Sequence, residues 1–327
     1  MPLSIRRMAG QAVLAMAILT LAQSAAAQSY PSRPVRMLHG FSAGTNVDTI
    51  SRLMATELSK ILGQSVLVEA QPGAGSTIAA ATVARAKPDG YTLLMTTGSH
   101  SVAGALYEKL PYDTEKSFSY ISTVTFFPFA VTASTVTGRY QNLNDLIAYA
   151  RANPGKVNYG SSGSGSTNHL AGEVLAIMTR TQMQHVPYKG LAPAITAMLA
   201  GEIDFVVGSA NSVLGQVKAG KMRVLAMAAP QRWSGMPDVP TAAEQGLKDY
   251  DMSSWAGLMG PADLPGAVVD RLHADTQKAL QVPLVRTTLE EQGGEPRGST
   301  PREMSSLVSN ELKRWTLVVN EAKIPKL

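Results

Sequence analysis

The hydrophobic and polar positions of the chain follow two alternating patterns. Short runs of β-branched or apolar residues are separated by longer segments in which apolar residues recur at helical spacing. The range 48–61 is a segment of the second kind, with one apolar face formed by Ile50, Leu53, Met54, Leu58 and Ile61. This alternation predicts an α/β protein whose mostly parallel sheets are covered by helices.

Individual elements can be placed from the same pattern. The sequence predicts strands at 35–38, 66–68, 92–96, 129–132, 157–159, 184–186, 205–207 and 224–228, and helices at 48–61 and 143–152. Gly63 is expected to end the first helix. Two capping boxes, Thr241 with Glu244 and Thr300 with Glu303, predict two further helix starts.

The first 27 residues have the pattern of a secretory signal peptide. Arg6 and Arg7 precede an apolar run at 8–21, and three alanines end at Ala27. The apolar run is about 14 residues long, shorter than the roughly 20 needed to cross a bilayer as a helix. We therefore expect cleavage after Ala27, export to the periplasm and no permanent anchor from this segment.

Composition excludes several classes of function. Without 1–27 the chain keeps 27 of its 29 basic residues against 24 acidic ones, a net charge of about +3. This small and evenly spread charge argues against nucleic acid as a partner. The chain has no Cys, which excludes disulfides, thiolate metal sites and a Cys nucleophile.

Three expected strand-to-helix junctions, at 41–48, 72–77 and 160–167, are rich in Gly, Ser and Thr. Free backbone N–H groups and the positive end of the helix dipole meet at such a place, so a carboxylate is a natural guest. The alternative is that these segments only reverse the chain, and the third could also be a flexible linker. No nucleotide-binding spacing and no metal-binding His spacing occurs, so we expect neither a cofactor nor a metal.

A series of ordered motifs carries a resemblance to a known family. They are YPSRPVR at 30–36, GFSAG at 40–44, QPGAG at 71–75, KPDGYTL at 87–93, LIAYARANPGK at 146–156, GSSG at 160–163, HLA at 169–171, VPYKG at 186–190 and DVPT at 238–241. In these motifs the chain resembles the Bug-type periplasmic receptors of the tripartite tricarboxylate transporter family. The resemblance covers nearly all of the sequence after the expected signal peptide.

The resemblance implies a two-lobed α/β fold of the periplasmic-binding-protein kind, type II-like, with a ligand cleft between lobes joined by crossing strands. No linker or repeat separates two continuous halves. We therefore expect a discontinuous first lobe of 28–131 plus 254–327 and a second lobe of 132–253. The chain would cross near Val131 and return within 253–258, with the two crossings as a hinge.

The resemblance also implies that backbone N–H groups of two loops hold a ligand carboxylate. The residues concerned are Phe41, Ser42, Ala43, Gly44, Thr45, Asn46 and Asp48 in the first loop, and Ser161, Ser162, Gly163, Gly165, Ser166 and Thr167 in the second. Asp48 would orient the polar end of the ligand or, equally, cap its own helix. Thr45 and Ser76 stand where the family commonly has a second glycine, which predicts a slightly smaller or more decorated pocket.

Four further residues are weaker candidates, because they follow expected strands or begin expected helices: Ser99, His169, Ser209 and Asn211. His169 could equally be a satisfied helix residue, and Ser209 and Asn211 could be turn formers. Phe126, Phe127 and Phe129 are expected to be core residues rather than ligand contacts.

The sequence thus predicts a monomeric receptor, not an enzyme, that binds a small carboxylate and delivers it to the membrane components of a tripartite transporter. A dicarboxylate or a related organic acid is the expected ligand, without a choice between aliphatic and aromatic acids. Two alternatives stay open: an exported hydrolase whose Ser, His and Asp meet only in space, and a sensor for a membrane signalling protein.

Overall fold

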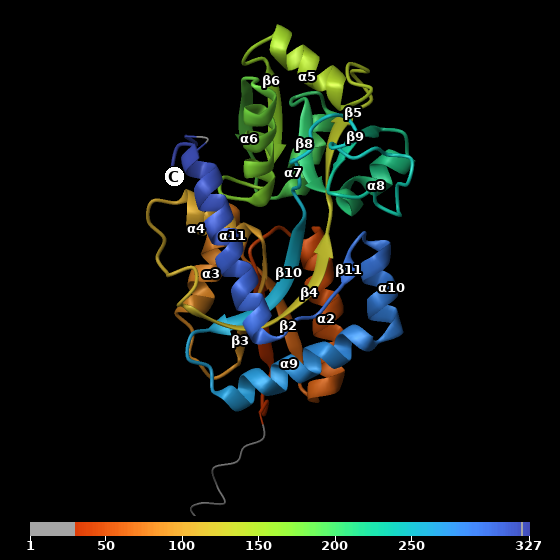
Figure 1. Ribbon diagram of the computed structural model, residues 1–327. Helices are drawn as coiled ribbons and strands as arrows, with labels where there is room; N and C mark the ends of the chain where they lie inside the picture. The colour runs from red at the N-terminus through yellow and green to blue at the C-terminus, as the bar shows by residue number, and fades with distance from the viewer. Residues whose placement is uncertain (1–29, 322) are drawn as a thin grey trace, which may run out of the picture.

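The computed structural model describes residues 30–321 and 323–327, and the chain folds into two α/β lobes, each built around its own sheet (Figure 1). The expected signal peptide and its cleavage after Ala27 lie outside the described residues. Among the residues described, no helix has both the length and the apolar character that a membrane crossing requires.

The first lobe contains a six-stranded sheet in the order β11-β4-β10-β3-β1-β2. Its strands are β1 (Val35–His39), β2 (Val66–Ala70), β3 (Thr92–Thr97), β4 (Phe118–Phe127), β10 (Ser254–Pro261) and β11 (Glu295–Pro296). Its helices are α2 (Asn46–Leu62), the short 3₁₀ helix η1 (Ala74–Ser76), α3 (Thr77–Ala84), α4 (Ser99–Leu106), α9 (Gly266–Gln281), α10 (Pro283–Glu291) and α11 (Pro301–Glu321). The predicted apolar face of α2 is confirmed at Ile50, Met54 and Leu58, which are buried in the core.

The second lobe contains a five-stranded sheet in the order β7-β6-β8-β5-β9. Its strands are β5 (Phe129–Ser134), β6 (Val157–Ser161), β7 (Met183–Pro187), β8 (Phe205–Ser209) and β9 (Met222–Ala228). Its helices are α5 (Leu143–Ala152), α6 (Thr167–Thr179), α7 (Leu191–Leu199) and α8 (Ala210–Lys218).

Both sheets are mixed rather than mostly parallel. The βα units give parallel pairs between β1, β2 and β3 and between β6, β7 and β8. Strands β4, β5, β9, β10 and β11 pair antiparallel. Antiparallel pairing occurs at the strands that carry the chain between the lobes, a feature that the alternating pattern does not reveal.

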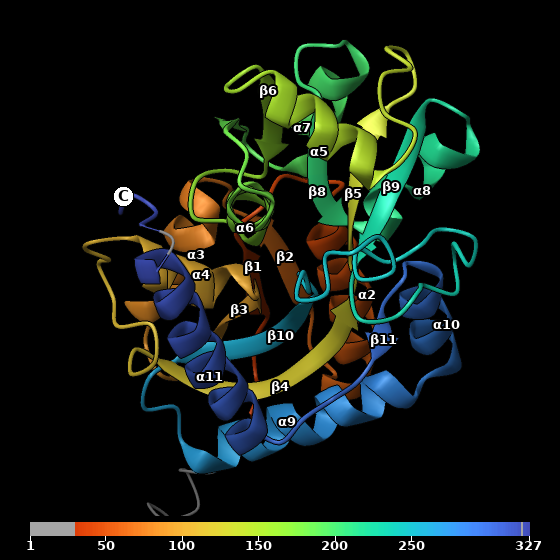
Figure 2. The ribbon, with the colours of Figure 1, turned by 45° about the horizontal axis from the view of Figure 1, so that its top comes forward.

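The lobes are connected by strands that lie side by side (Figures 1 and 2). The chain leaves β4 at Phe127, passes Pro128 and enters β5, so the expected crossing point at Val131 lies inside a strand of the second sheet. It returns into the first sheet where β10 begins, at Ser254. The residue ranges of the two lobes themselves stay a prediction.

The two capping boxes have different outcomes. Thr300 and Glu303 exchange hydrogen bonds, with Thr300 N donating to Glu303 Oε2 at 2.8 Å, and α11 begins at the next residue. Thr241 and Glu244 exchange the same bonds, yet no helix follows, so the helix predicted there is wrong. Only turns form after Thr241, and Gly246 leaves the helical region with a φ of 97°.

Candidate ligand site between the two lobes

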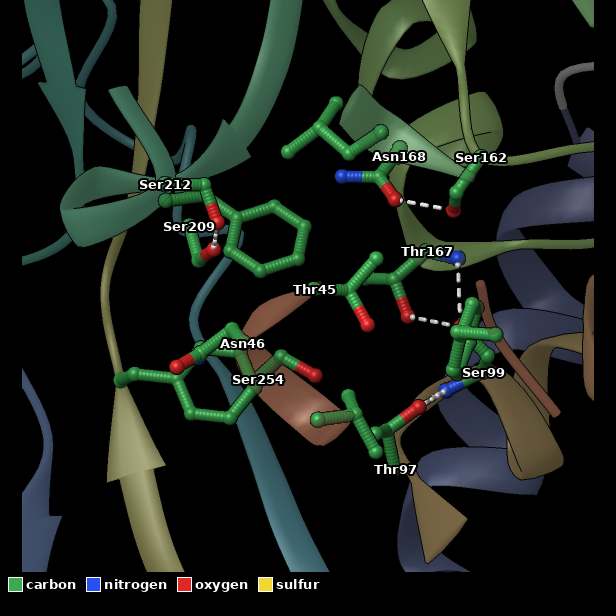
Figure 3. Close-up of a pocket in the computed structure, with 15 residues that line it drawn as sticks. Thr45, Asn46, Thr97, Ser99, Ser162, Thr167, Asn168, Ser209, Ser212 and Ser254 are labelled. Atoms are coloured by element: carbon green, nitrogen blue, oxygen red, sulfur yellow. Dashed lines mark hydrogen bonds between the residues drawn. The ribbon is translucent and has the colours of Figure 1, made fainter. Parts of the chain in front are cut away.

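A cavity with a volume of about 50 Å³ lies between the lobes, and Figure 3 shows the residues that line it. Five helices begin at its lining. The first turns or caps of α2, α4, α6, α7 and α8 contribute Asn46, Ser99, Thr167, Leu191 and Ser209 to its lining. The first four N–H groups of a helix have no acceptor within the helix, and the helix dipole is positive there. The cavity therefore combines donors from both lobes around one small space.

None of the described residues that line the cavity has a charged side chain. Eight lining residues carry hydroxyl groups: Thr45, Thr97, Ser99, Ser162, Thr167, Ser209, Ser212 and Ser254. Asn46 and Asn168 add side-chain amides, and the apolar part is formed by Phe41, Val47, Phe127, Phe129 and Leu191. An anion would be held here by neutral donors and helix dipoles rather than by an ion pair.

Thr45 shapes the first-lobe side of the cavity. Its hydroxyl donates to Ser42 O at 2.9 Å and accepts from Asp48 N at 3.4 Å, which makes it the N-cap of α2. The residue that departs from the family pattern thus lines the cavity and fixes the start of a helix at the same time.

Asp48 is held by the protein itself. Its carboxylate accepts from Gly44 N at 2.9 Å, from His39 Nε2 at 3.0 Å and from Arg52 Nε at 3.0 Å. Burial acts to raise the pKa of Asp48, but hydrogen bonds from Arg52, Gly44 and His39 lower it below its ordinary value. Since Asp48 does not line the cavity, the geometry favours its role in holding the loop over a role in orienting the ligand.

Two histidines form hydrogen bonds to the second-lobe loop at 161–167. Ser161 Oγ lies 2.6 Å from His185 Nε2, and Gly165 N donates to His169 Nδ1 at 3.4 Å. The two imidazole rings stack with centroids 3.9 Å apart. Burial lowers the pKa of His169 to about 4 and that of His185 to about 3, so both are neutral near pH 7. Ser166 caps α6 by accepting from His169 N at 3.2 Å.

The lobes also touch each other directly around the cavity. Thr167 N donates to Ser99 Oγ at 3.1 Å, and Asn211 Nδ2 donates to Asn46 Oδ1 at 3.0 Å. Ser42 Oγ donates to Lys189 O. These hydrogen bonds join opposite lobes, so the structure is a closed arrangement.

The predicted site residues fall into three groups. Seven line the cavity: Phe41, Thr45, Asn46, Ser99, Ser162, Thr167 and Ser209. Two line an adjoining groove, Gly44 and Asn211. The remaining eight line neither space: Ser42, Ala43, Asp48, Ser161, Gly163, Gly165, Ser166 and His169. Ligand binding by any of these residues stays a prediction.

Eight lining residues were not predicted: Val47, Thr97, Phe127, Phe129, Asn168, Leu191, Ser212 and Ser254. Phe127 and Phe129 are buried core residues, as expected, and they also form a cavity wall in which their rings stack at 6.1 Å. Val47 and Asn168 come directly after Asn46 and Thr167, which were predicted, so the sequence pattern already indicated these two positions. Thr97 and Ser254 lie at strand ends that only the assembled sheet brings together.

The sequence matches the family model described as "Tripartite tricarboxylate transporter family receptor" over residues 50–324. The chain belongs to this receptor family. It is 31% identical to Protein BugT of Bordetella pertussis over 314 residues, which cover 95% of this chain and 96% of BugT. It is therefore a Bug-type receptor, as the motifs predict.

Two solved structures match the fold of this chain closely over their whole length. The R. palustris protein Rpa4515 with adipate has a TM-score of 0.87 and 31% identity, covering 91% of this chain and all of that one (100%). MatC from Rhodopseudomonas palustris with bound malate has a TM-score of 0.84 and 32% identity, covering 89% of this chain and 100% of that one.

The relatives of this Bug-type receptor are substrate-binding proteins, and its geometry gives the hydrolase alternative little support. Ser161 and His185 form a Ser–His pair, but Ser161 is fully buried and lies outside the cavity lining. Within the described residues no carboxylate bonds to His185, whereas a nucleophilic triad needs one to orient the imidazole. Nor do residues 30–321 and 323–327 bring together three side chains suited to hold a metal ion.

Proposed function

We propose that this protein is a periplasmic receptor that closes its two lobes on a small organic carboxylate and delivers it to the membrane components of a tripartite transporter. One observation carries the proposal. Helix starts from both lobes converge on one cavity, and no residue in the described part of its lining is charged.

The electrostatics of the cavity suit a carboxylate. Each helix N-terminus carries about half a positive charge, and several such ends act on the same small volume. A cationic ligand would lose its hydration without meeting any negative side chain in the lining. The ligands of two family relatives, adipate and malate, support a dicarboxylate or a related organic acid.

Closure follows from the placement of donors on both lobes. A ligand shifts a conformational equilibrium only when it binds one state more tightly than the other. A carboxylate that accepts hydrogen bonds from both Ser99 of the first lobe and Thr167 of the second could do so only in the closed state, in which their hydroxyl oxygens lie 3.2 Å apart (Figure 3). Binding energy would thereby drive closure, and the closed form is the one in which the loaded receptor would meet its membrane partner.

The place of action and the oligomeric state belong to the same proposal. The expected signal peptide would take the chain to the periplasm, where it would act as a monomer. N-terminal sequencing of the exported protein should begin at Gln28, and its mass in solution should be that of one chain.

A thermal-shift screen of the mature protein against a carboxylate panel that includes malate and adipate tests the ligand class. A ligand at 100 times its dissociation constant should add about 2.7 kcal/mol to the stability of the folded state. If no carboxylate raises the unfolding temperature, the proposal is wrong.

Two matched variants on α6 test the closure mechanism. Thr167→Val removes a lining hydroxyl that lies 3.2 Å from Ser99 Oγ, and Thr179→Val removes a buried hydroxyl at the far end of the same helix. We expect Thr167→Val to lower ligand affinity about tenfold and to reduce compaction on ligand addition, as measured by small-angle scattering. Thr179→Val should keep both properties, and a Thr167→Val protein that loses one property while fully retaining the other would contradict the mechanism.

A further inference from the structure

A carboxylate of α11 lies close to the cavity without lining it. Glu311 Oε2 accepts a hydrogen bond from Trp255 Nε1 at 2.9 Å, and Trp255 is buried in the first lobe. Trp255 follows Ser254 in β10, and Ser254 lines the cavity. The Glu311 side chain is half-buried, and its bond to a buried indole turns the carboxylate toward the interior.

The start of α4 shows how near this carboxylate is to the cavity. Gly98 is the N-cap of α4 and stands between Thr97 and Ser99, which both line the cavity. A Cβ atom added to Gly98 would lie 3.0 Å from Ser254 Oγ and 3.5 Å from Glu311 Oε2. A hydroxyl group of the lining and the Glu311 carboxylate therefore lie beside the same residue of the chain.

The surroundings of Glu311 favour its protonated form. Burial raises the pKa of the carboxyl from its ordinary value of 4.5 to about 7, although a hydrogen bond from Trp255, the charge of Arg314 and a hydrogen bond from Ser101 act to lower it. Arg314 is exposed and donates through Nη2 to Asp251 O at 2.8 Å. Glu311 therefore changes its charge near neutral pH.

The elements that pack around Glu311 contribute no other group that titrates between pH 7 and 8.5. The titratable residue of α4 is His100, whose pKa burial lowers to about 4, and that of β4 is Tyr120, whose pKa burial raises. Strand β10 contains no titratable residue. Asp251, which precedes β10, meets the guanidinium of Arg314 through its backbone carbonyl.

A ligand carboxylate in the cavity and an ionised Glu311 would place two like charges at the start of one helix. Two like charges roughly 12 Å apart, at an effective dielectric constant of about 20, change an equilibrium by about tenfold. Both would also compete for the positive end of the α4 dipole. A protonated Glu311 removes this repulsion, so the ligand must favour the protonated form, and by linkage its binding raises the pKa of Glu311 further.

We propose that Glu311 is a proton site coupled to the ligand site, so that the receptor binds its carboxylate ligand together with one proton. The proton comes from the solvent and is held on the Glu311 carboxylate, while the ligand stays ionised. This inference rests on the proposed function and adds a compensating charge to the bound state. Ligand affinity is then fully present below about pH 7 and falls as the pH rises, because binding must protonate an ionised Glu311.

Calorimetric titration of the full mature protein measures this proton directly. Malate and adipate are the probes, or the tightest acid of the thermal-shift panel if neither binds, and their carboxyl groups are ionised at pH 7.5. Titrations at pH 7.5 in two buffers with different heats of ionisation should show an uptake of about half a proton per ligand. The affinity should be about fivefold lower at pH 8.5 than at pH 6.5.

Two matched variants on α11 assign the proton. Glu311→Gln cannot ionise and keeps an acceptor for Trp255 Nε1, so it should bind without proton uptake and with equal affinity at pH 6.5 and 8.5. Glu321→Gln, which replaces an exposed carboxylate at the end of the same helix, should keep the uptake and the pH dependence of the unaltered protein. A purely structural role of Glu311 would lower the affinity by the same factor at both pH values.

The outcomes distinguish the two proposals. Ligand binding without proton uptake by the unaltered protein, or equal uptake by Glu311→Gln, overturns the proton site and leaves the carboxylate receptor standing. The first of these results needs no variant, so it decides the question even if Glu311→Gln folds poorly. Binding of no carboxylate in the panel overturns the proposed function and the proton site with it.

Discussion

Gly75 of the first lobe and Gly165 of the second meet backbone to backbone. A Cβ atom added to Gly75 would lie 2.8 Å from the carbonyl carbon of Gly165 and 2.8 Å from Ser164 O. Real Cβ atoms do not approach main-chain atoms so closely. The closed arrangement therefore requires glycine at position 75.

We expect Gly75→Ala to hinder closure, because the added methyl group would hold the lobes apart. Ligand affinity should fall at least about tenfold, and ligand-induced compaction in small-angle scattering should be lost. Gly63→Ala is the matched control, since Gly63 also has a positive φ, 70°, but a Cβ atom added there would have no neighbouring atom within 4 Å. Both variants should lose about 1 kcal/mol of stability through backbone strain, and equal affinities of the two for the ligand would contradict the closure contact.

Thr45→Gly tests whether the departure from the family pattern sets the size of the cavity. Glycine removes a side chain from the lining and, as an N-cap, costs only a few tenths of a kcal/mol. We expect the affinity ratio of adipate to malate to change by about threefold or more in favour of the larger acid.

Ser76→Gly is the control for this change, because Ser76 is the second departure from the pattern and does not line the cavity. Ser76 has a φ of 84°, so glycine should relieve strain and stabilise the fold by about 1 kcal/mol without changing ligand preference. If Thr45→Gly leaves both affinity and preference as they were, the cavity is not limited by Thr45.

The parts of the fold that could be predicted are those encoded locally. Helix α5 occurs at 143–152, as the apolar spacing predicts, and Gly63 ends α2 with a φ of 70°. Strand β4 was not predicted, because its pairing depends on β10, which is more than a hundred residues away in the sequence. The capping box at Thr241 is the opposite case, because a local pattern predicted a helix that does not form. Its hydrogen bonds are present, but no helix follows them.

The same division applies to the site. Loops rich in Gly, Ser and Thr before helices indicate a binding site within one segment, and they led to Thr45, Ser162 and Thr167. Ser254 and Phe127 become neighbours in the wall only through pairing of β4 with β10. A single sequence contains no local signal for such pairs, and it could not show which loop residues, such as Ser161, support the loop instead of facing the cavity.

The two stacked histidines, His169 and His185, should make the stability of the folded protein depend on pH. The pKa values of His169 and His185 in the folded state, about 4 and about 3, are lower than their ordinary value of 6.5. Between pH 6.5 and 4 the unfolded chain therefore binds protons that the folded chain does not, so stability is fully present above about pH 6.5 and falls as the pH is lowered. The loss should reach at most about 1.4 kcal/mol per pH unit for each histidine, and less for the half-buried His185.

Thermal unfolding of the unliganded protein from pH 7 to pH 4 measures this effect. His185→Gln should make the fall in unfolding temperature shallower. His39 and His100 remain in this variant, and burial lowers their pKa values too, so part of the acid sensitivity should persist. If the unfolding temperature of His185→Gln falls with pH as steeply as that of the unaltered protein, protonation of the imidazole bonded to Ser161 is not a cause of the acid sensitivity. A shallower slope would show that the second-lobe loop depends on a neutral imidazole, and ligand affinity should then weaken over the same pH range in which stability is lost.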